Sequence, residues 1–199
     1  MSNKLKIRSD DEMQSRRKCF IEICEILEKI DIFYFIQGGV LLGAYRENDF
    51  IKWDWDVEIS LFAEEFFNKF DLIKKELVLN GYKIIKESKV LKNIKLELAK
   101  EQPYEITGYT LMGWNHDKKR KEYYRWKINI PEKYFYNIGQ INFLNKKVNC
   151  PTPIEDYLVY QYGDWKTPLK TDDKNIYLSK SFYKSDTFLK KIINMFKKY

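Results

Sequence analysis

The sequence predicts a single α/β domain with a mixed sheet, of the α+β type rather than a regular alternation of strands and helices. Two observations indicate this. Segments with helical periodicity and segments with strand character follow one another without strict strand–helix–strand order. The 199 residues are 44% hydrophobic and 17% aromatic, which suits one folded domain with a proper core. Since no repeat or linker-like stretch divides the chain, we expect residues 1–199 to form one domain.

The first part of the chain predicts two long helices around a short strand–helix–strand segment. Ser9 and Glu12 have the spacing of a capping box, which opens a helix, and the apolar residues that follow recur at helical spacing. Asp31 ends this helix. After it we expect a strand at Phe33–Ile36, a short helix at Val40–Arg46, a strand at Trp53–Ile59, and a helix at Ala63–Asn80 that Gly81 terminates.

The second part of the chain is predicted to be mainly strand. We expect strands at Tyr82–Lys86, Ile94–Leu98, Tyr104–Leu111 and Tyr124–Ile130, a charged loop at Asn115–Glu122, and a hairpin around Asn145. Thr152 and Glu155 form a second capping box, with Pro153 as the first helical residue of a helix that ends at Gly163. Residues 185–198 predict a basic amphipathic helix.

The net charge of +7 and the pI near 9.0 favour anionic partners, such as nucleotides, phosphorylated glycans or a membrane surface. The lysines are interspersed with acids along the whole chain, so we do not expect a nucleic-acid-binding protein. The first residues contain no apolar signal region, and no window approaches the length of a membrane-spanning helix. We therefore expect a cytoplasmic protein, with peripheral contact at the inner face of the cytoplasmic membrane as an alternative location.

The region from Gln37 to Ser60 carries the chemical signal. Gly38 and Gly39 follow a predicted strand and open a helix, where backbone N–H groups can approach a phosphate closely. Asp54, Asp56 and Glu58 then alternate along the next predicted strand, which places the three carboxylates on one face. A divalent cation such as Mg²⁺ or Mn²⁺ relieves the repulsion between such neighbours and neutralises charge on a transferred phosphoryl group.

Each part of this pattern has a simpler interpretation. Alternating acids are common on the solvated face of an edge strand, and a glycine pair is more often a turn than a phosphate site. The two parts together, in this order and at this spacing, are more specific than either one. They favour a metal-dependent phosphate site.

The same region resembles the signature of the LicD family, approximately GGTLLGAxRHxGFIPWDDDIDI. The chain reads GGVLLGAYRENDFIKWDWDVEI there, from Gly38 to Ile59. A second resemblance lies downstream in PTPIEDYLVYQYGDWKTP, where relatives have a proline, a helix with YL, and YGDW followed by proline. The two segments occur in the family's order and cover roughly residues 16–170. The chain is therefore identified as similar to LicD, fukutin and fukutin-related proteins.

This resemblance implies a nucleotidyltransferase-like fold and a transferase. Relatives move phosphocholine, ribitol phosphate or similar groups, including glycerol phosphate, from CDP-linked donors to a glycan or lipid-linked glycan, as in lipopolysaccharide or capsule biosynthesis. The matched positions imply Asp56 and Glu58 as paired catalytic metal ligands with Asp54 as a further ligand. A third strand normally adds another carboxylate, for which Glu105 is the first candidate and Glu97 the second. Substrate-binding roles are expected for four residues: Gly38, Gly39, Arg46 and Asp164.

The chain departs from the signature in ways that bear on activity. Trp55 stands where relatives have the middle acid, and Glu58 replaces the last aspartate. Two alternatives therefore remain beside phospho-alcohol transfer. One is a nucleotidyltransferase that moves a nucleoside monophosphate from a nucleoside triphosphate to a small molecule. The other is a non-catalytic binding protein with the same fold.

Overall fold

The computed structural model describes residues 5–100, 106–126 and 128–182. Its described strands form a seven-stranded mixed sheet in the order β1-β2-β5-β4-β3, extended by β6 on β5 and β7 on β6, and a separate hairpin of β8 and β9. The central neighbours β2 (Val57–Phe62) and β5 (Ile106–Asp117) run parallel, and the other pairs are antiparallel. The predicted mixed α/β fold is confirmed.

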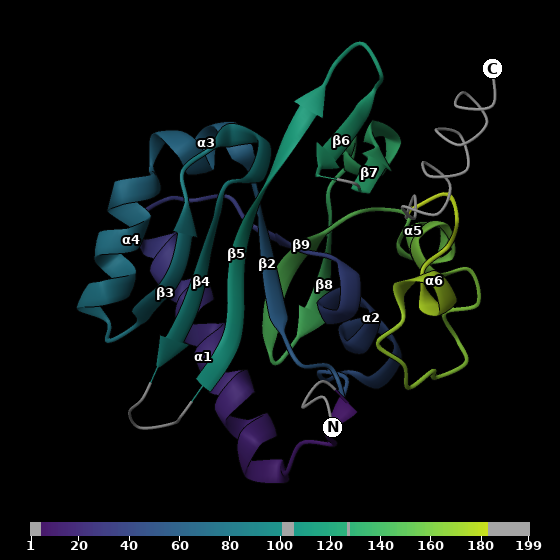
Figure 1. Ribbon diagram of the computed structural model, residues 1–199, viewed down its shortest axis with the longest axis horizontal. Coiled ribbons are helices and arrows are strands. Elements are labelled where there is room, and N and C mark those ends of the chain that lie inside the picture. The colour runs from purple at the N-terminus through teal and green to yellow at the C-terminus, as the bar shows by residue number, and fades with distance from the viewer. Residues whose placement is uncertain (1–4, 101–105, 127, 183–199) are drawn as a thin grey trace, which may run out of the picture.

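Helices pack against the sheet as their apolar spacing predicts. The long helix α1 (Asp10–Lys29) crosses behind the strands, and α4 (Phe70–Leu79) packs beside it at the edge near β3 (Figure 1). The capping box of Ser9 and Glu12 is present at the start of α1, and Phe20, Ile23 and Leu27 are fully buried. Burying this apolar face stabilises the helix far more than its local propensity does.

The segment that carries the chemical signal folds as strand, helix and strand. β1 (Phe35–Ile36) pairs with β2, and α2 (Gly38–Glu47) lies between them in the chain. The predicted strand Trp53–Ile59 is wrong at its start, because the structure begins β2 at Val57. The backbone turns before β2, where Asp54 N donates to Ile51 O. Arg8 and Arg16 donate to the carbonyl groups of residues 54 and 55, which a neighbouring strand would otherwise bond.

Several predicted boundaries are corrected by tertiary pairing. The helix expected at 63–80 is two helices, α3 (Ala63–Asn68) and α4, separated at Lys69. β3 (Lys83–Ser88) and β4 (Lys95–Lys100) are close to expectation. β5 continues into the expected loop as far as Asp117, because β6 (Glu122–Arg125) pairs with it, and residues 118–121 form the turn between them. The strand expected at 124–130 is two strands, β6 and β7 (Ile128–Pro131).

The last described elements complete the side of the molecule near α2. The predicted hairpin is confirmed as β8 (Gly139–Phe143) and β9 (Lys146–Cys150), and the predicted helix as α5 (Ile154–Tyr162). The second capping box is wrong. The Thr152 hydroxyl donates to Asn137 O instead of capping the helix, and the helix is preceded by Pro153 as N-cap.

A short helix that the sequence did not predict, α6 (Lys174–Tyr177), lies against the C-terminal end of α5 (Figure 1). The expected basic helix at 185–198 lies outside the described residues. Within the described ranges, no helix is both long enough and apolar enough to cross a membrane. Cys19, Cys24 and Cys150 are all buried and free.

Candidate active site

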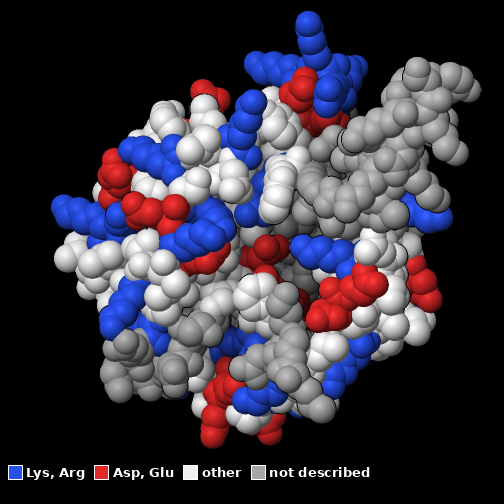
Figure 2. All heavy atoms as spheres, in the orientation of Figure 1, with Lys and Arg blue, Asp and Glu red and all other residues white. Residues whose placement is uncertain are grey.

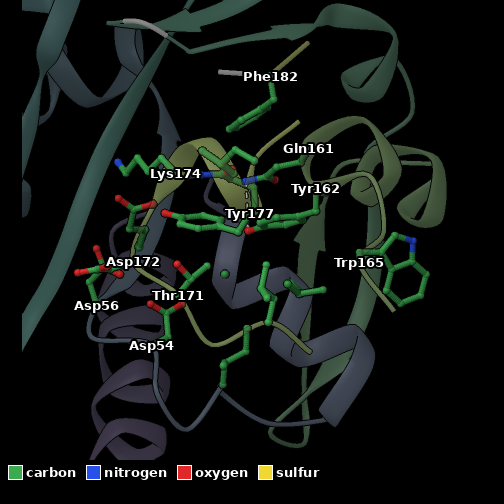
Figure 3. Close-up of a pocket in the computed structure, with 18 of the residues that line it drawn as sticks. Asp54, Asp56, Gln161, Tyr162, Trp165, Thr171, Asp172, Lys174, Tyr177 and Phe182 are labelled. Atoms are coloured by element: carbon green, nitrogen blue, oxygen red, sulfur yellow. Dashed lines mark hydrogen bonds between the residues drawn. The ribbon is translucent and has the colours of Figure 1, made fainter. Parts of the chain in front are cut away.

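A cavity of about 650 Å³ opens where α2, the loop before β2, β6, α5 and the segment around α6 meet. Figure 2 shows acidic side chains in a hollow near the centre of this face, with basic side chains beside them. The side chains in Figure 3 approach this space from several elements, with Asp54 and Asp56 on one side and Tyr162 and Tyr177 on another. Residues far apart in the sequence therefore share one site.

The three predicted carboxylates, Asp54, Asp56 and Glu58, all line this cavity. A side-chain hydrogen bond joins Asp54 and Asp56. Burial, together with the nearby charges of Glu58 and Asp54, raises the pKa of Asp56 to about 9. Burial also raises the pKa of Asp54 and that of Glu58. The metal-free cluster therefore retains a proton at neutral pH, which relieves the repulsion between its carboxyl groups.

A buried arginine from α1 supports the loop that carries these carboxylates. Arg16 is only 5% exposed, and its Nη2 donates to Trp55 O at 2.6 Å. Its charge lowers the pKa of both Asp54 and Asp56, opposing the effect of burial. Arg8 donates to the carbonyl groups of Asp54 and Trp55 as well. Neither arginine was predicted from the sequence, because their partners are backbone groups 39 to 47 residues away.

The two glycines allow close packing at the start of α2. The carboxylate of Asp54 lies so close to Gly39 that a side-chain carbon there would overlap Asp54 Oδ2. Gly38 has a left-handed φ of 63°. A side-chain carbon at Gly38 would lie 3.7 Å from Gln161 Nε2 and 3.9 Å from Glu58 Oε2. The space that was expected to admit a phosphate at Gly39 is thus occupied by one of the chain's own acids, which the positive N-terminal end of the helix favours.

Two of the predicted substrate-binding side chains, Arg46 and Asp164, line the cavity and already have partners. Arg46 Nη1 donates to Trp165 O at 3.0 Å, and its Nη2 donates to Glu47 at 2.6 Å. Asp164 accepts from the Thr167 hydroxyl at 2.9 Å, which lowers the pKa of this carboxyl group. Arg46 therefore ties α2 to the loop after α5.

The structure brings three further polar side chains to the cavity. Gln161 of α5 is 4% exposed, and its Nε2 donates to the Tyr162 hydroxyl. Arg125 at the end of β6 and Lys174 of α6 line the cavity as well, and both charges lower the pKa of Glu58. Gln161 lies within the YLVYQYGDW stretch, so the sequence predicted its helix. The sequence did not predict that the Gln161 side chain would line the cavity. Arg125 and Lys174 had no signal in the sequence beyond their charge.

The predicted third carboxylate ligand had two candidates, Glu105 and Glu97. Glu105 lies outside the described residues. Glu97 is described, but it pairs with Lys95 and does not line the cavity. On β5, which pairs with β2, the register places Thr110 beside Glu58. Asp172 of the unpredicted segment lines the cavity instead.

The carboxylate oxygens of Asp54, Asp56 and Glu58 are the type of ligand that a hard divalent cation prefers. Asp54 and Asp56 share a hydrogen bond at a place where a cation would replace the proton, and oxygen ligands suit Mg²⁺ and Mn²⁺. Across residues 5–100, 106–126 and 128–182, no group of three or more His, Cys, Asp or Glu side chains is arranged as a complete metal site. Asp54, Asp56 and Glu58 are the described residues that would contribute ligands.

Comparison with known proteins decides the family. The model of the LicD/FKTN/FKRP nucleotidyltransferase domain matches residues 31–153, more than half of the chain. The chain belongs to this LicD family. The matched range includes the three carboxylates, both glycines and Arg125, whereas Gln161, Asp164 and α6 follow it.

The LicD relatives with curated descriptions are distant. The ribitol-5-phosphate transferase FKTN of Macaca fascicularis is 24% identical over 175 residues, covering 81% of this chain and 36% of that protein. The human ribitol 5-phosphate transferase FKRP is 42% identical over 43 residues, covering 22% of this chain and 9% of that protein. The chain thus spans about a third or less of the length of these relatives.

One solved structure, ANT(2")-Ia in complex with adenylyl-2"-tobramycin, is similar with a TM-score of 0.45 and 14% identity, covering 73% of this chain and 76% of that chain.

Proposed function

We propose that the chain transfers a phospho-alcohol group from a CDP-linked donor to a hydroxyl of a glycan or lipid-linked glycan, with Mg²⁺ or Mn²⁺ as cofactor. The alcohol would be ribitol, choline or glycerol-like. The observation that carries this proposal is the cluster of Asp54, Asp56 and Glu58, which lies beside the first residues of α2. The cluster is inside the family-matched range and lines a cavity. The distant relatives named as ribitol-5-phosphate transferases support the class of donor.

In the proposed reaction the acceptor hydroxyl attacks the phosphorus nearer the alcohol. A new P–O bond to the glycan forms, the P–O bond to CMP breaks, and CMP leaves with the bond's electron pair. The hydroxyl proton passes to a carboxylate of the cluster, which must be ionised to accept it. Bound divalent cations would neutralise the charge that develops on the transferred group.

The cavity suits this chemistry in size and lining. Its volume of about 650 Å³ is in the range of small-molecule sites, and it combines acids, cations and the aromatic rings of Tyr162 and Tyr177. Trp55, which replaces an acid of the signature, is 46% exposed. The carboxylates at positions 54, 56 and 58 all line the cavity without an acid at position 55.

The test is CMP release from a panel of CDP-alcohols, with Mg²⁺ or Mn²⁺ and a glycan extract as acceptor. We expect one donor to give CMP in a reaction that EDTA stops. Release of pyrophosphate from a nucleoside triphosphate, with nucleotide attached to a small acceptor, would instead establish nucleotidyl transfer. No turnover and no binding of metal or nucleotide by the folded protein would indicate the non-catalytic alternative.

A further inference from the structure

Two cations face Glu58 from elements that no motif singled out. Arg125 ends β6 and Lys174 begins α6, and both line the cavity. Among the described residues neither cation has a carboxylate within ion-pair distance, and Arg125 Nε is buried without a hydrogen-bond partner. Lys174 is exposed to solvent, whereas a buried guanidinium nitrogen without a partner is costly, so we expect Arg125 to meet an anion when the site is in use.

The position of Lys174 is set by contacts that hold α6 on α5. Asp173 caps α6 by accepting from Asn175 N at 2.9 Å. The ring of Tyr177 stacks with that of Tyr162, with centroids 6.5 Å apart, and Ser179 N donates to Gln161 O at 2.8 Å. In Figure 3 the Lys174 side chain points to the side of the cavity where Asp172 and Asp56 are drawn, and its charge acts on Glu58. The lysine is thus directed towards the acidic cluster.

The chemistry of these groups selects the class of ligand. An ammonium and a guanidinium only donate hydrogen bonds, so they match phosphate oxygens, which only accept them. Two cations on different elements beside the same cavity suit two linked phosphoryl groups better than one. They also lie next to the carboxylates, where charge would develop as a diphosphate is cleaved.

We propose that Arg125 and Lys174 bind the diphosphate of a nucleoside diphosphate donor, and that residues 173–179 are therefore part of the donor site. This inference rests on the proposed function and adds the residues that recognise its donor. It also assigns a role to a segment that lies beyond the family-matched range. The alternative is that Lys174 only holds Glu58 in the empty site and moves away when a ligand enters.

The test measures binding rather than turnover. Titration calorimetry with inorganic pyrophosphate, CDP, CMP and cytidine, each with Mg²⁺, is run on the wild type and on Lys174→Ala. Lys170→Ala is the matched control, because Lys170 lies on the same segment, is exposed and does not line the cavity. Lys174→Arg tests whether charge at this position is sufficient. Arg125→Lys is included with a thermal melt, since Arg125 is half-buried.

We expect Lys174→Ala to weaken pyrophosphate and CDP binding about tenfold or more, as for loss of a hydrogen bond between charged groups. CMP should weaken less and cytidine should not change. Lys170→Ala should bind as the wild type does, and Lys174→Arg should retain most of the affinity. The salt dependence of CDP binding should also become shallower in Lys174→Ala.

The inference is overturned if the alanine variants at 170 and 174 bind pyrophosphate and CDP alike, if Lys174→Ala binds them more tightly, or if the wild type binds neither. Pyrophosphate binding that depends on Lys174, in a protein that releases CMP from no CDP-alcohol, would uphold the anion site and reject the proposed donor. The two proposals can therefore fail separately.

Discussion

The carboxylate of Asp54 occupies the space that any side chain on Gly39 would need. This contact joins the two halves of the family signature, the glycine pair at the start of α2 and the acids before and at the start of β2. It explains why a glycine is required at position 39 although its φ is not left-handed. The role of Gly39 is to admit an acid of the chain itself against the N-terminal end of a helix.

Gly39→Ala should therefore displace Asp54 and lower CMP release by about tenfold or more, the cost of misplacing a group at a reaction centre. A double-mutant cycle isolates the cause. With Asp54→Ala already present, Gly39→Ala should raise the free energy of unfolding by up to about 1 kcal/mol, the usual helix preference for alanine. In the wild-type background it should not. Equal effects in both backgrounds, measured by urea unfolding, would show that the Gly39–Asp54 contact is unimportant.

Arg46 is predicted to act on stability more than on donor affinity. Its guanidinium bonds Trp165 O and Glu47, and its side chain is mostly buried. Arg46→Ala should lower the free energy of unfolding by about 1–3 kcal/mol, as for other hydrogen bonds of charged groups. Pyrophosphate affinity should change little. A variant with unchanged stability and clearly weaker pyrophosphate binding would return Arg46 to the phosphate-binding role expected from the sequence.

The raised pKa of Asp56 predicts how the metal-free protein responds to pH. The folded protein holds this proton up to about pH 9, whereas the unfolded chain releases it near the ordinary aspartate value. Between these limits the folded state binds more protons, so stability falls as pH rises, by at most about 1.4 kcal/mol per pH unit for one proton. Asp56→Asn removes the contribution of Asp56 to this dependence. Urea unfolding in EDTA at pH 6 and pH 9 should show a larger stability gain from the substitution at pH 9, and an equal or smaller gain at pH 9 would refute the shift.

Binding of Mg²⁺ or Mn²⁺ should release protons, because the ligands must be ionised. Calorimetry at pH 7 in two buffers of different ionisation enthalpy measures the number released. We expect roughly one proton or more per site in the wild type and markedly fewer in Asp56→Asn. Metal binding without proton release would place the cation away from this cluster.

The sequence predicted the local features of the site and missed those that depend on distant contacts. The glycine pair, the three acids and their family were visible because they lie within 21 residues of one another. The start of β2 was misplaced because Arg8 and Arg16, from before and within α1, bond the carbonyl groups of residues 54 and 55. Only the tertiary fold brings these arginines there.

The side of the cavity formed by α6 was likewise not predicted from the sequence. α6 is too short for a periodic signal, and it is held in place by Tyr162 and by the end of α5 rather than by its own sequence. Lys174 therefore looked like one basic residue among 36. Its role could be inferred only once its direction towards the acidic cluster was known.

The most direct test of the central claim compares two aspartate-to-asparagine changes in the CMP-release assay with the active CDP donor. Asp56 lies in the proposed centre, and Asp71 is an exposed acid of α4 that pairs with Lys89. We expect Asp56→Asn to lower kcat at least about a hundredfold, as for loss of a principal charge at a phosphoryl-transfer site. Asp71→Asn should leave kcat unchanged, and both variants should remain folded. Wild-type CMP release in a folded Asp56→Asn protein would contradict the assignment of this cluster as the catalytic centre.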